Sequence, residues 1–274
     1  MISEKIELLG KGVYKNIPDV LTLKALPTSS ELDYVGAEDF DRTMIDKILP
    51  RAVEEKINFN ELLEIDYQWI CRCLRLVNYG PYHTTNSIYC PDCGKRHIGD
   101  YQVDLRSIDC IPLPDGFKNS VTVGKDAFLD FDSDIKAKLL TIREIIDAYE
   151  DKAFKMSDGT IDRDLARSCY MITAVGGQSV RPIEAKLILE EKMSSADYMI
   201  LKDELYKLTN YGLRAGGTVK CPVCGSTRAA YVALTDDRFF RCTVDNLRKW
   251  RDDRRAGRNK DVLRDTPADV REHS

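Results

Sequence analysis

Apolar residues recur at a spacing of three and four along several stretches of the chain, which is the period of a helix with one buried face. The strongest cases are residues 58–77, residues 134–149 and a stretch that follows the capping-box-like sequence at 194–197. Weaker helices are expected over 39–49, 161–174 and 182–192. The apolar positions of the three strong helices are Leu62, Ile65, Trp69, Cys73 and Leu76, then Ile135, Leu139, Ile142, Ile146 and Tyr149, then Tyr198, Leu201, Leu205 and Leu208.

Shorter stretches alternate between apolar and polar residues or lie between turn residues, which is typical of strands. They predict strands near 21–26, 86–90, 98–105, 119–123, 217–220 and 228–235. Because the helical stretches are longer than these strands, we predict an α+β fold that is mainly helical.

One block of this pattern occurs twice. Each copy has Asp-Tyr near the start of a helix, Asn-Tyr-Gly at its end, a predicted hairpin with Cys-Pro-x-Cys-Gly, and then a tyrosine, over residues 66–101 and 197–231. We interpret the blocks as two related halves; the alternative is a coincidence of common turn residues. This interpretation gives an N-terminal half over 1–110, a helical C-terminal half over 111–242 and a charged tail over 243–274.

The cysteines fall into two groups. The chain has nine, an odd number, and no sign of a secretion signal, which argues against a disulfide framework. Five of them, in apolar or helix-like contexts, are expected to be small core residues: Cys71, Cys73, Cys110, Cys169 and Cys242. The other four form the two Cys-Pro-x-Cys-Gly turns: Cys90, Cys93, Cys221 and Cys224.

Two residues between cysteines allow both sulfurs of a tight turn to reach one metal ion, and the glycine that follows tolerates the turn's backbone. One such turn, a zinc knuckle, supplies only two of the four ligands that Zn²⁺ requires. We therefore predict that each half ends in a short β-hairpin zinc knuckle and that the two form one zinc-ribbon-like site. Cys90, Cys93, Cys221 and Cys224 would hold a structural Zn²⁺ there.

Three other interpretations of the turns stay open. Each pair could be a redox motif, although such a motif normally begins a helix after a strand. Each pair could bind its own ion with help from His83 or His97, although the second pair has no histidine nearby. The turns could also be free of metal.

Charge and hydropathy restrict the class of protein. The 274-residue chain has a net charge of −4, which excludes a globally basic nucleic-acid binder, and no apolar run long enough to span a membrane. Its charged N-terminus does not resemble a signal peptide, so we expect an intracellular protein. Residues 241–260 are basic and contain Trp250. They are either an arm for an acidic surface or phosphates, or a solvated, partly helical tail.

Candidates for catalysis are few. The chain has three histidines, and no pair of its many carboxylates is singled out by its context. The acids at 130–134 resemble a calcium loop, but Ile135 stands where that loop requires glycine. A closed shell of four cysteines also leaves no open coordination position. We therefore predict a protein that is not an enzyme and has no catalytic residues.

The order of elements resembles a known family. The early strand 21–26, a helix that ends in Leu-Arg-Leu-Val-Asn-Tyr-Gly at 74–80, the knuckle at 90–94 and a helical second half carry the likeness. Over residues 15–235 the layout is similar to that of the baseplate hub assembly proteins of T-even-type tailed bacteriophages, in their zinc-knuckle-bearing relatives. The resemblance implies a component of a contractile tail that works through contacts with other tail or baseplate proteins.

The prediction that follows is a structural or assembly protein of a phage tail baseplate. It would be located in the host cytoplasm during assembly or in the virion, without a membrane partner. The alternative is a zinc-ribbon accessory protein that binds nucleic acid through its basic C-terminal segment and Trp250. The acidity of the chain as a whole argues against this alternative.

Overall fold

The structure is a computed structural model, and it describes residues 3–27, 30, 33, 37, 39–214, 216–232, 237–240 and 242–256. Of these residues, 42% are helical and 25% lie in strands, so the prediction of a mainly helical fold is wrong and the fold is mixed. The main reason is that the strands are longer and more numerous than the alternating pattern suggested. The first knuckle hairpin alone has strands of 9 and 10 residues.

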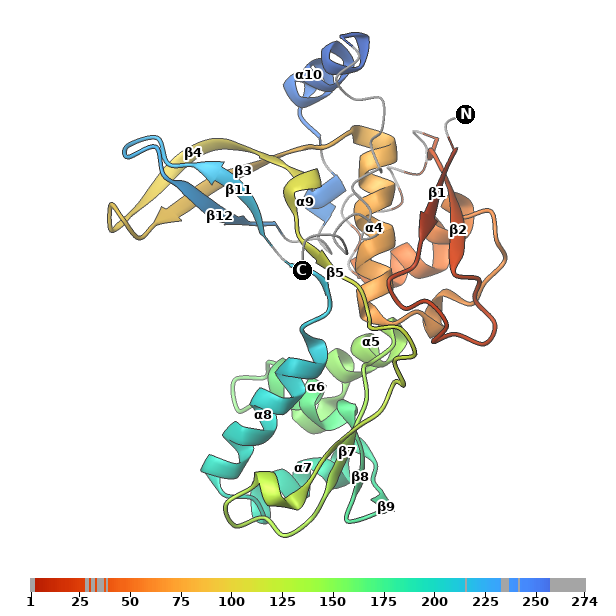
Figure 1. The fold of residues 1–274 in the computed structure, drawn as a ribbon, viewed down its shortest axis with the longest axis vertical. Coiled ribbons are helices and arrows are strands. Elements are labelled where there is room, and N and C mark those ends of the chain that lie inside the picture. The colour runs from red at the N-terminus through yellow and green to blue at the C-terminus, as the bar shows by residue number, and fades with distance from the viewer. Residues whose placement is uncertain are drawn as a thin grey trace. The chain divides into compact units, whose positions relative to one another are not determined.

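The helices follow the chain in an order close to the predicted one, with several short helical turns between them. They are α2 (Phe40–Thr43), α3 (Leu49–Ala52), α4 (Glu64–Tyr79), α5 (Ile142–Glu150), α6 (Arg163–Met171), α7 (Pro182–Glu191), α8 (Ser195–Thr209), α9 (Asp237–Phe240) and α10 (Val244–Arg255), and Figure 1 labels α4 to α10. The short turns are η2 (Met44–Ile48), η3 (Phe59–Glu61), η4 (Leu105–Ser107), η5 (Lys125–Ala127) and η6 (Lys152–Phe154).

The strands pair antiparallel in several small sheets. Among the described residues there are four two-stranded sheets, β1–β2, β3–β4, β5–β10 and β11–β12, and one four-stranded sheet in the order β6–β7–β8–β9. The strands are β1 (Ser3–Glu7), β2 (Val20–Lys24), β3 (Tyr82–Cys90), β4 (Lys95–Asp104), β5 (Cys110–Ile111), β6 (Val121–Val123), β7 (Ile135–Ala137), β8 (Ile172–Val175), β9 (Gln178–Ser179), β10 (Gly212–Leu213), β11 (Gly216–Lys220) and β12 (Thr227–Tyr231).

The chain divides into two compact units. Unit 1 comprises Met1–Ile57, Ile65–Leu113 and Gly212–Ser274, and unit 2 comprises Asn58–Glu64 and Pro114–Tyr211. Unit 2 is therefore largely one insertion into unit 1. Within unit 1, the short strands β5 and β10 pair at the points where the chain leaves for unit 2 and returns from it.

Helix α4 forms the centre of unit 1. From Ile65 to Val77 all of its residues except Gln68 are buried, whereas the sequence predicted a single buried face. Its buried polar groups have hydrogen-bond partners, as buried polar groups generally do, and most of these partners are backbone groups. Asp66 accepts hydrogen bonds from the Leu9 and Gly10 N–H groups, so the loop after β1 is fixed to the helix.

A buried arginine of α4 joins three segments of unit 1. Arg75 donates hydrogen bonds to the backbone carbonyls of Phe239, Gly80 and Tyr82 at 2.9, 2.8 and 2.9 Å. These carbonyls belong to α9, to the turn after α4 and to the start of β3. One guanidinium with its fixed fork of donors therefore sets the direction in which the hairpin leaves α4.

The C-terminal helix α10 packs on the hairpin β3–β4 through one face. Asn246 donates to the Thr84 hydroxyl at 2.9 Å and accepts from the Gln102 amide at 2.6 Å. The ring of Trp250 lies against Gly80, where a Cβ atom would come within 2.4 Å of the indole. The described part of the basic segment is therefore a docked helix; residues 257–274 of the expected tail lie outside the described part.

Unit 2 consists of the four-stranded sheet and helices α5 to α8, of which α5 and α7 pack on α6. The predicted helix over 134–149 is wrong in its first half, because Ile135–Ala137 is strand β7 and the helix begins only at Ile142. Ile135, Ala137 and Leu139 are buried at every second position, which is the strand period. Thr141 and Glu144 cap α5 reciprocally.

Asp197 of α8 plays the same part in unit 2 as Asp66 plays in unit 1. Its buried carboxylate accepts backbone hydrogen bonds from Leu129, Asp130 and Phe131 and one from the Ser194 hydroxyl. Burial raises the pKa of Asp197, but these donors outweigh it and leave the pKa below its usual value. In the described part of the chain, no helix is both long and apolar enough to cross a bilayer.

Candidate metal centre

Two hairpins of unit 1 carry the Cys-Pro-x-Cys-Gly turns. The first turn joins β3 to β4 and the second joins β11 to β12 (Figure 1). Gly94 and Gly225 close the turns with φ angles of +63° and +72°, a conformation that favours glycine. The same backbone pairing occurs within each turn, between the first cysteine and the residue five positions later. Cys90 pairs with Lys95, and the Cys221 N–H donates to the Ser226 carbonyl. The sequence prediction of two hairpin turns is confirmed.

The two hairpins lie against each other, with β12 beside β3 and β11 beside β4. Gly217 on β11 allows the closest approach, because a Cβ atom there would lie 2.1 Å from Cγ1 of Val103 on β4. The Thr218 N–H also donates to the Ser107 hydroxyl at 3.4 Å. A glycine in β11 and a valine in β4 thus let the two hairpins pack closely at the ends opposite their turns.

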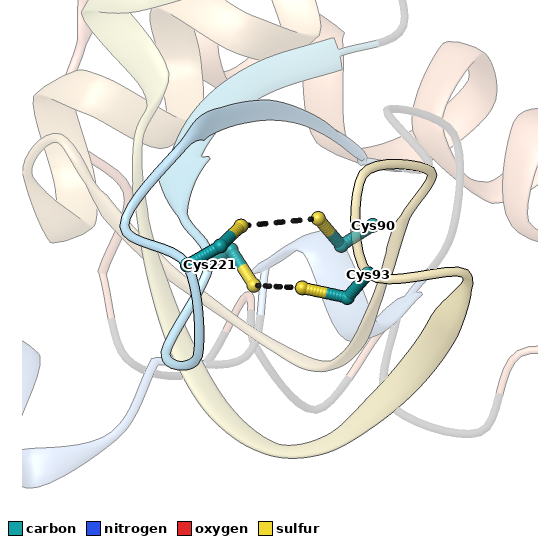
Figure 2. Close-up of side chains that lie close together, drawn as sticks. Cys90, Cys93 and Cys221 are labelled. Atoms are coloured by element: carbon teal, nitrogen blue, oxygen red, sulfur yellow. Dashed lines mark hydrogen bonds between the residues drawn. The ribbon is translucent and has the colours of Figure 1, made fainter.

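This packing gathers the four predicted cysteines at one point, and Figure 2 shows three of them, Cys90, Cys93 and Cys221. The Cys90 and Cys224 sulfurs are 3.6 Å apart, and the Cys93 and Cys221 sulfurs are 3.7 Å apart. All four sulfurs lie within 4.8 Å of one another. Each close pair joins one turn to the other, across 134 and 128 residues of sequence.

These distances fit a tetrahedral metal ion. Four sulfurs at about 2.3 Å from a zinc ion lie about 3.8 Å from one another along the edges of the tetrahedron. The two measured cross-turn distances agree with that edge. All nine cysteines are free thiols, and the sulfurs of these four are too far apart for the S–S bond of about 2.05 Å in a disulfide.

The cluster is buried on one side only. Cys90 and Cys221 are buried, Cys93 is half-buried and Cys224 is exposed. A hydrogen bond from Arg228 lowers the pKa of Cys90 to about 5, whereas the neighbouring sulfurs raise the pKa of Cys93 to about 12. Like charges this close resist joint ionisation, so a bound cation is what would allow four thiolates.

The geometry argues against the other interpretations of the turns. Separate ions would need a histidine beside its own pair, but His97 of the first hairpin lies 3.5 Å from the Cys221 sulfur of the second turn. His83 instead stacks on Phe239, with ring centroids 5.9 Å apart. A redox turn would begin a helix, whereas both of these turns connect antiparallel strands.

The remaining cysteines are not part of the cluster. Cys71, Cys73 and Cys169 are buried, as the sequence predicted for core residues, and Cys110 and Cys242 are half-buried. Burial raises the pKa of Cys73, Cys110 and Cys169 to about 12, so these thiols stay protonated at neutral pH.

The sequence analysis missed three side chains beside the cluster. The Ser226 hydroxyl lies 2.8 Å from the Cys224 sulfur and 3.7 Å from that of Cys90. Arg228 forms an ion pair with Asp92, which lies inside the first turn. The signal for Arg228 was present in the repeat, because it stands four residues after Cys224, as His97 stands four residues after Cys93.

Comparison with known proteins identifies no relative: no family model, curated protein or solved structure matches this chain. The fold and the site therefore define the molecule only as a mixed α and β protein with four clustered cysteines suited to a metal ion.

Proposed function

We propose that this is a non-enzymatic structural or assembly protein in which one structural Zn²⁺ joins two distant hairpins. The observation that carries the proposal is that the sulfurs of Cys90, Cys93, Cys221 and Cys224 lie within 4.8 Å of one another, although they come from two segments of unit 1 that are separated by the insertion. Zinc suits this ligand set because soft thiolates in a tetrahedron select it over harder ions. When bound, the zinc would supply only cross-linking, since four protein ligands complete its shell.

We propose further that the protein belongs to the baseplate hub of a phage contractile tail. The support is the sequence pattern of a helix, Asn-Tyr-Gly, a hairpin and Cys-Pro-x-Cys-Gly, which resembles the hub assembly proteins of T-even-type phages. Exposed apolar side chains are consistent with a role in protein contacts. Ile98 of β4 is 88% exposed, and Met199 and Tyr206 of α8 are 66% and 65% exposed.

The alternative, a zinc-ribbon protein that binds nucleic acid, has weaker support. It depends on the basic residues of α10, and several of these have partners within the chain. Arg248 pairs with Asp245 and Arg251 pairs with Asp252, while Lys249 lies over the Tyr82 ring. Basic side chains that already have acidic or aromatic partners within the chain contribute less to the binding of nucleic-acid phosphates.

Three experiments test the proposal and its alternative. Elemental analysis of the purified protein should find one zinc per chain. An absence of metal would contradict the proposed structural zinc. If the proposal is correct, tail-tube or hub proteins should be encoded beside its gene, and mixing the protein with them should give a stable complex on size-exclusion chromatography. If the chain instead binds duplex DNA at about 50 mM salt and loses that affinity steeply towards about 200 mM, the alternative is correct.

A further inference from the structure

His97 and Arg228 occupy the same position in the two hairpins. Each stands four residues after the second cysteine of its own turn. The strand register is also the same. His97 pairs with Ile88 and Arg228 pairs with Val219, and each of these partners stands two residues before the first cysteine of its own turn. The repeat seen in the sequence therefore extends to the pairing of individual residues around the metal site.

Both side chains reach across to the other turn. The Nε2 atom of His97 lies 3.5 Å from the sulfur of Cys221, the first cysteine of the second turn. Arg228 reaches the first turn, where its guanidinium forms an ion pair with Asp92 and a hydrogen bond with Cys90, the first cysteine of that turn. Among the described residues the buried Nε atom of Arg228 has no hydrogen-bond partner. Each first cysteine thus receives a nitrogen donor from the opposite hairpin.

The two cysteines that receive these donors are the buried ones. Cys90 is 0% exposed and Cys221 is 2% exposed. Four thiolates around Zn²⁺ leave a net charge of −2, and a charge that is out of water is costly unless donors neutralise it. N–H groups directed at metal-bound sulfur supply that compensation and orient the ligand.

We propose that His97 and Arg228 form a reciprocal cross-brace, in which each hairpin supplies the donor that secures the first metal-binding cysteine of the other. They are positioning residues that determine how tightly the metal is retained. This inference depends on the proposed zinc site and adds the residues that neutralise it. In each turn, the donor to the buried sulfur comes from the opposite hairpin. The metal is therefore held firmly only when both hairpins are in place.

The test measures zinc affinity by competition with a chromophoric chelator. Arg228→Met should weaken zinc binding by roughly ten- to a hundred-fold, and Arg228→Lys should recover part of that loss because it keeps the charge. His97→Phe should weaken binding, whereas His97→Gln should bind more tightly than His97→Phe because it keeps an N–H donor. The sulfur-to-metal charge-transfer band of the Co²⁺-substituted protein should shift in Arg228→Met, which a purely structural role would not cause.

Arg96→Met is the matched control. Arg96 lies next to His97 on β4, but its guanidinium binds the Ser87 hydroxyl at 3.0 Å, so its loss should leave zinc affinity unchanged. If Arg228→Met and His97→Phe bind zinc as tightly as this control, the cross-brace is wrong while the zinc site stands. A failure of the unmodified protein to bind zinc would instead refute the zinc site itself.

Discussion

At the scale of single residues, buried polar side chains with several backbone partners stabilise each unit internally. Asp66 and Asp197 are each completely buried, and each fixes a distant loop by accepting its N–H groups. Their sequence contexts are alike, since both precede a tyrosine near the start of a helix. Their electrostatics differ, because burial raises the pKa of Asp66 to about 6 whereas the pKa of Asp197 is lowered.

The raised pKa of Asp66 predicts a pH-dependent contribution to stability. An acid whose folded-state pKa lies above its unfolded value stabilises the fold at low pH and loses that contribution as the pH rises through about 6. Relative to Asp66→Asn, the natural protein should lose roughly 1–2 kcal/mol of unfolding free energy between about pH 5 and 7.5. Urea denaturation of both proteins across this range measures the difference. A constant difference would show that Asp66 ionises normally.

The metal-binding role of the cysteines predicts an effect that depends on position. Cys90→Ser should weaken zinc binding at least ten-fold and lower the unfolding temperature, because it removes one of four ligands. Cys110→Ser, a half-buried cysteine outside the cluster, should keep one zinc per chain. Competition with a chelator and thermal unfolding of the two variants provide the comparison. Equal zinc affinity in both would contradict the site.

At the scale of elements, glycines define where helices end and what can pack there. Gly80 ends α4 at a φ angle of +74°, and Gly212, which follows α8 in the second copy of the repeat, has a φ angle of +88°. Only glycine adopts this conformation readily. Gly80 has an additional role, because the indole of Trp250 occupies the space that a side chain would fill.

Gly80→Ala should therefore destabilise the protein more than the backbone strain alone would do. The strain costs roughly 1–2 kcal/mol, and displacement of the Trp250 ring adds to it. Gly12→Ala is the control, since its φ angle is +71° but no atom lies within 4 Å of the added Cβ. Chemical denaturation gives the free energies, and Trp250 fluorescence should shift only in Gly80→Ala. Equal losses in both would mean that α10 does not depend on this contact.

The elements that the sequence predicted well are those with a recognisable capping residue and a hydrophobic pattern that fits only one kind of secondary structure. Helix α8 begins after Ser194, whose hydroxyl accepts from the Asp197 N–H, and it ends before Gly212, as expected. The error at 134–149 arose because Ile135 and Leu139 fit a helix and a strand equally well; pairing of β7 with β6 and β8 decides between them. Helix α3 also continues past Pro50, which lies in its first turn, where proline is tolerated.

At the scale of the whole molecule, the candidate metal site joins the two segments of unit 1 that lie on either side of the insertion that forms most of unit 2. The first pair of cysteines precedes the insertion and the second pair follows it. Such a cross-link closes a long loop and so stabilises unit 1 against unfolding. Unit 2 has its own sheet and capped helices and contributes no cysteine to the cluster.

Removal of the metal should therefore affect the two units differently. A chelator should shift the thermal transition of unit 1 to lower temperature, while the transition of unit 2 should change little. Scanning calorimetry with and without chelator measures both transitions. Thiol titration of the native protein offers an independent check, because the exposed Cys224 should react with a thiol reagent only after chelation. Rapid reaction before chelation would show that the sulfurs hold no metal.

The sequence by itself determined the local chemistry: the glycine-closed turns, the capped helices, the repeated block and the four cysteines that belong together. The turns and the helix caps depend on neighbours a few residues apart, so residue type and spacing are sufficient to predict them. The grouping of the two cysteine turns followed instead from the four ligands that a Zn²⁺ ion requires. Tertiary structure alone decided that Arg228 faces Cys90, that α10 docks on the first hairpin and that Ile135–Ala137 is a strand. Each of these depends on partners distant in sequence, whose positions are set by packing and backbone pairing.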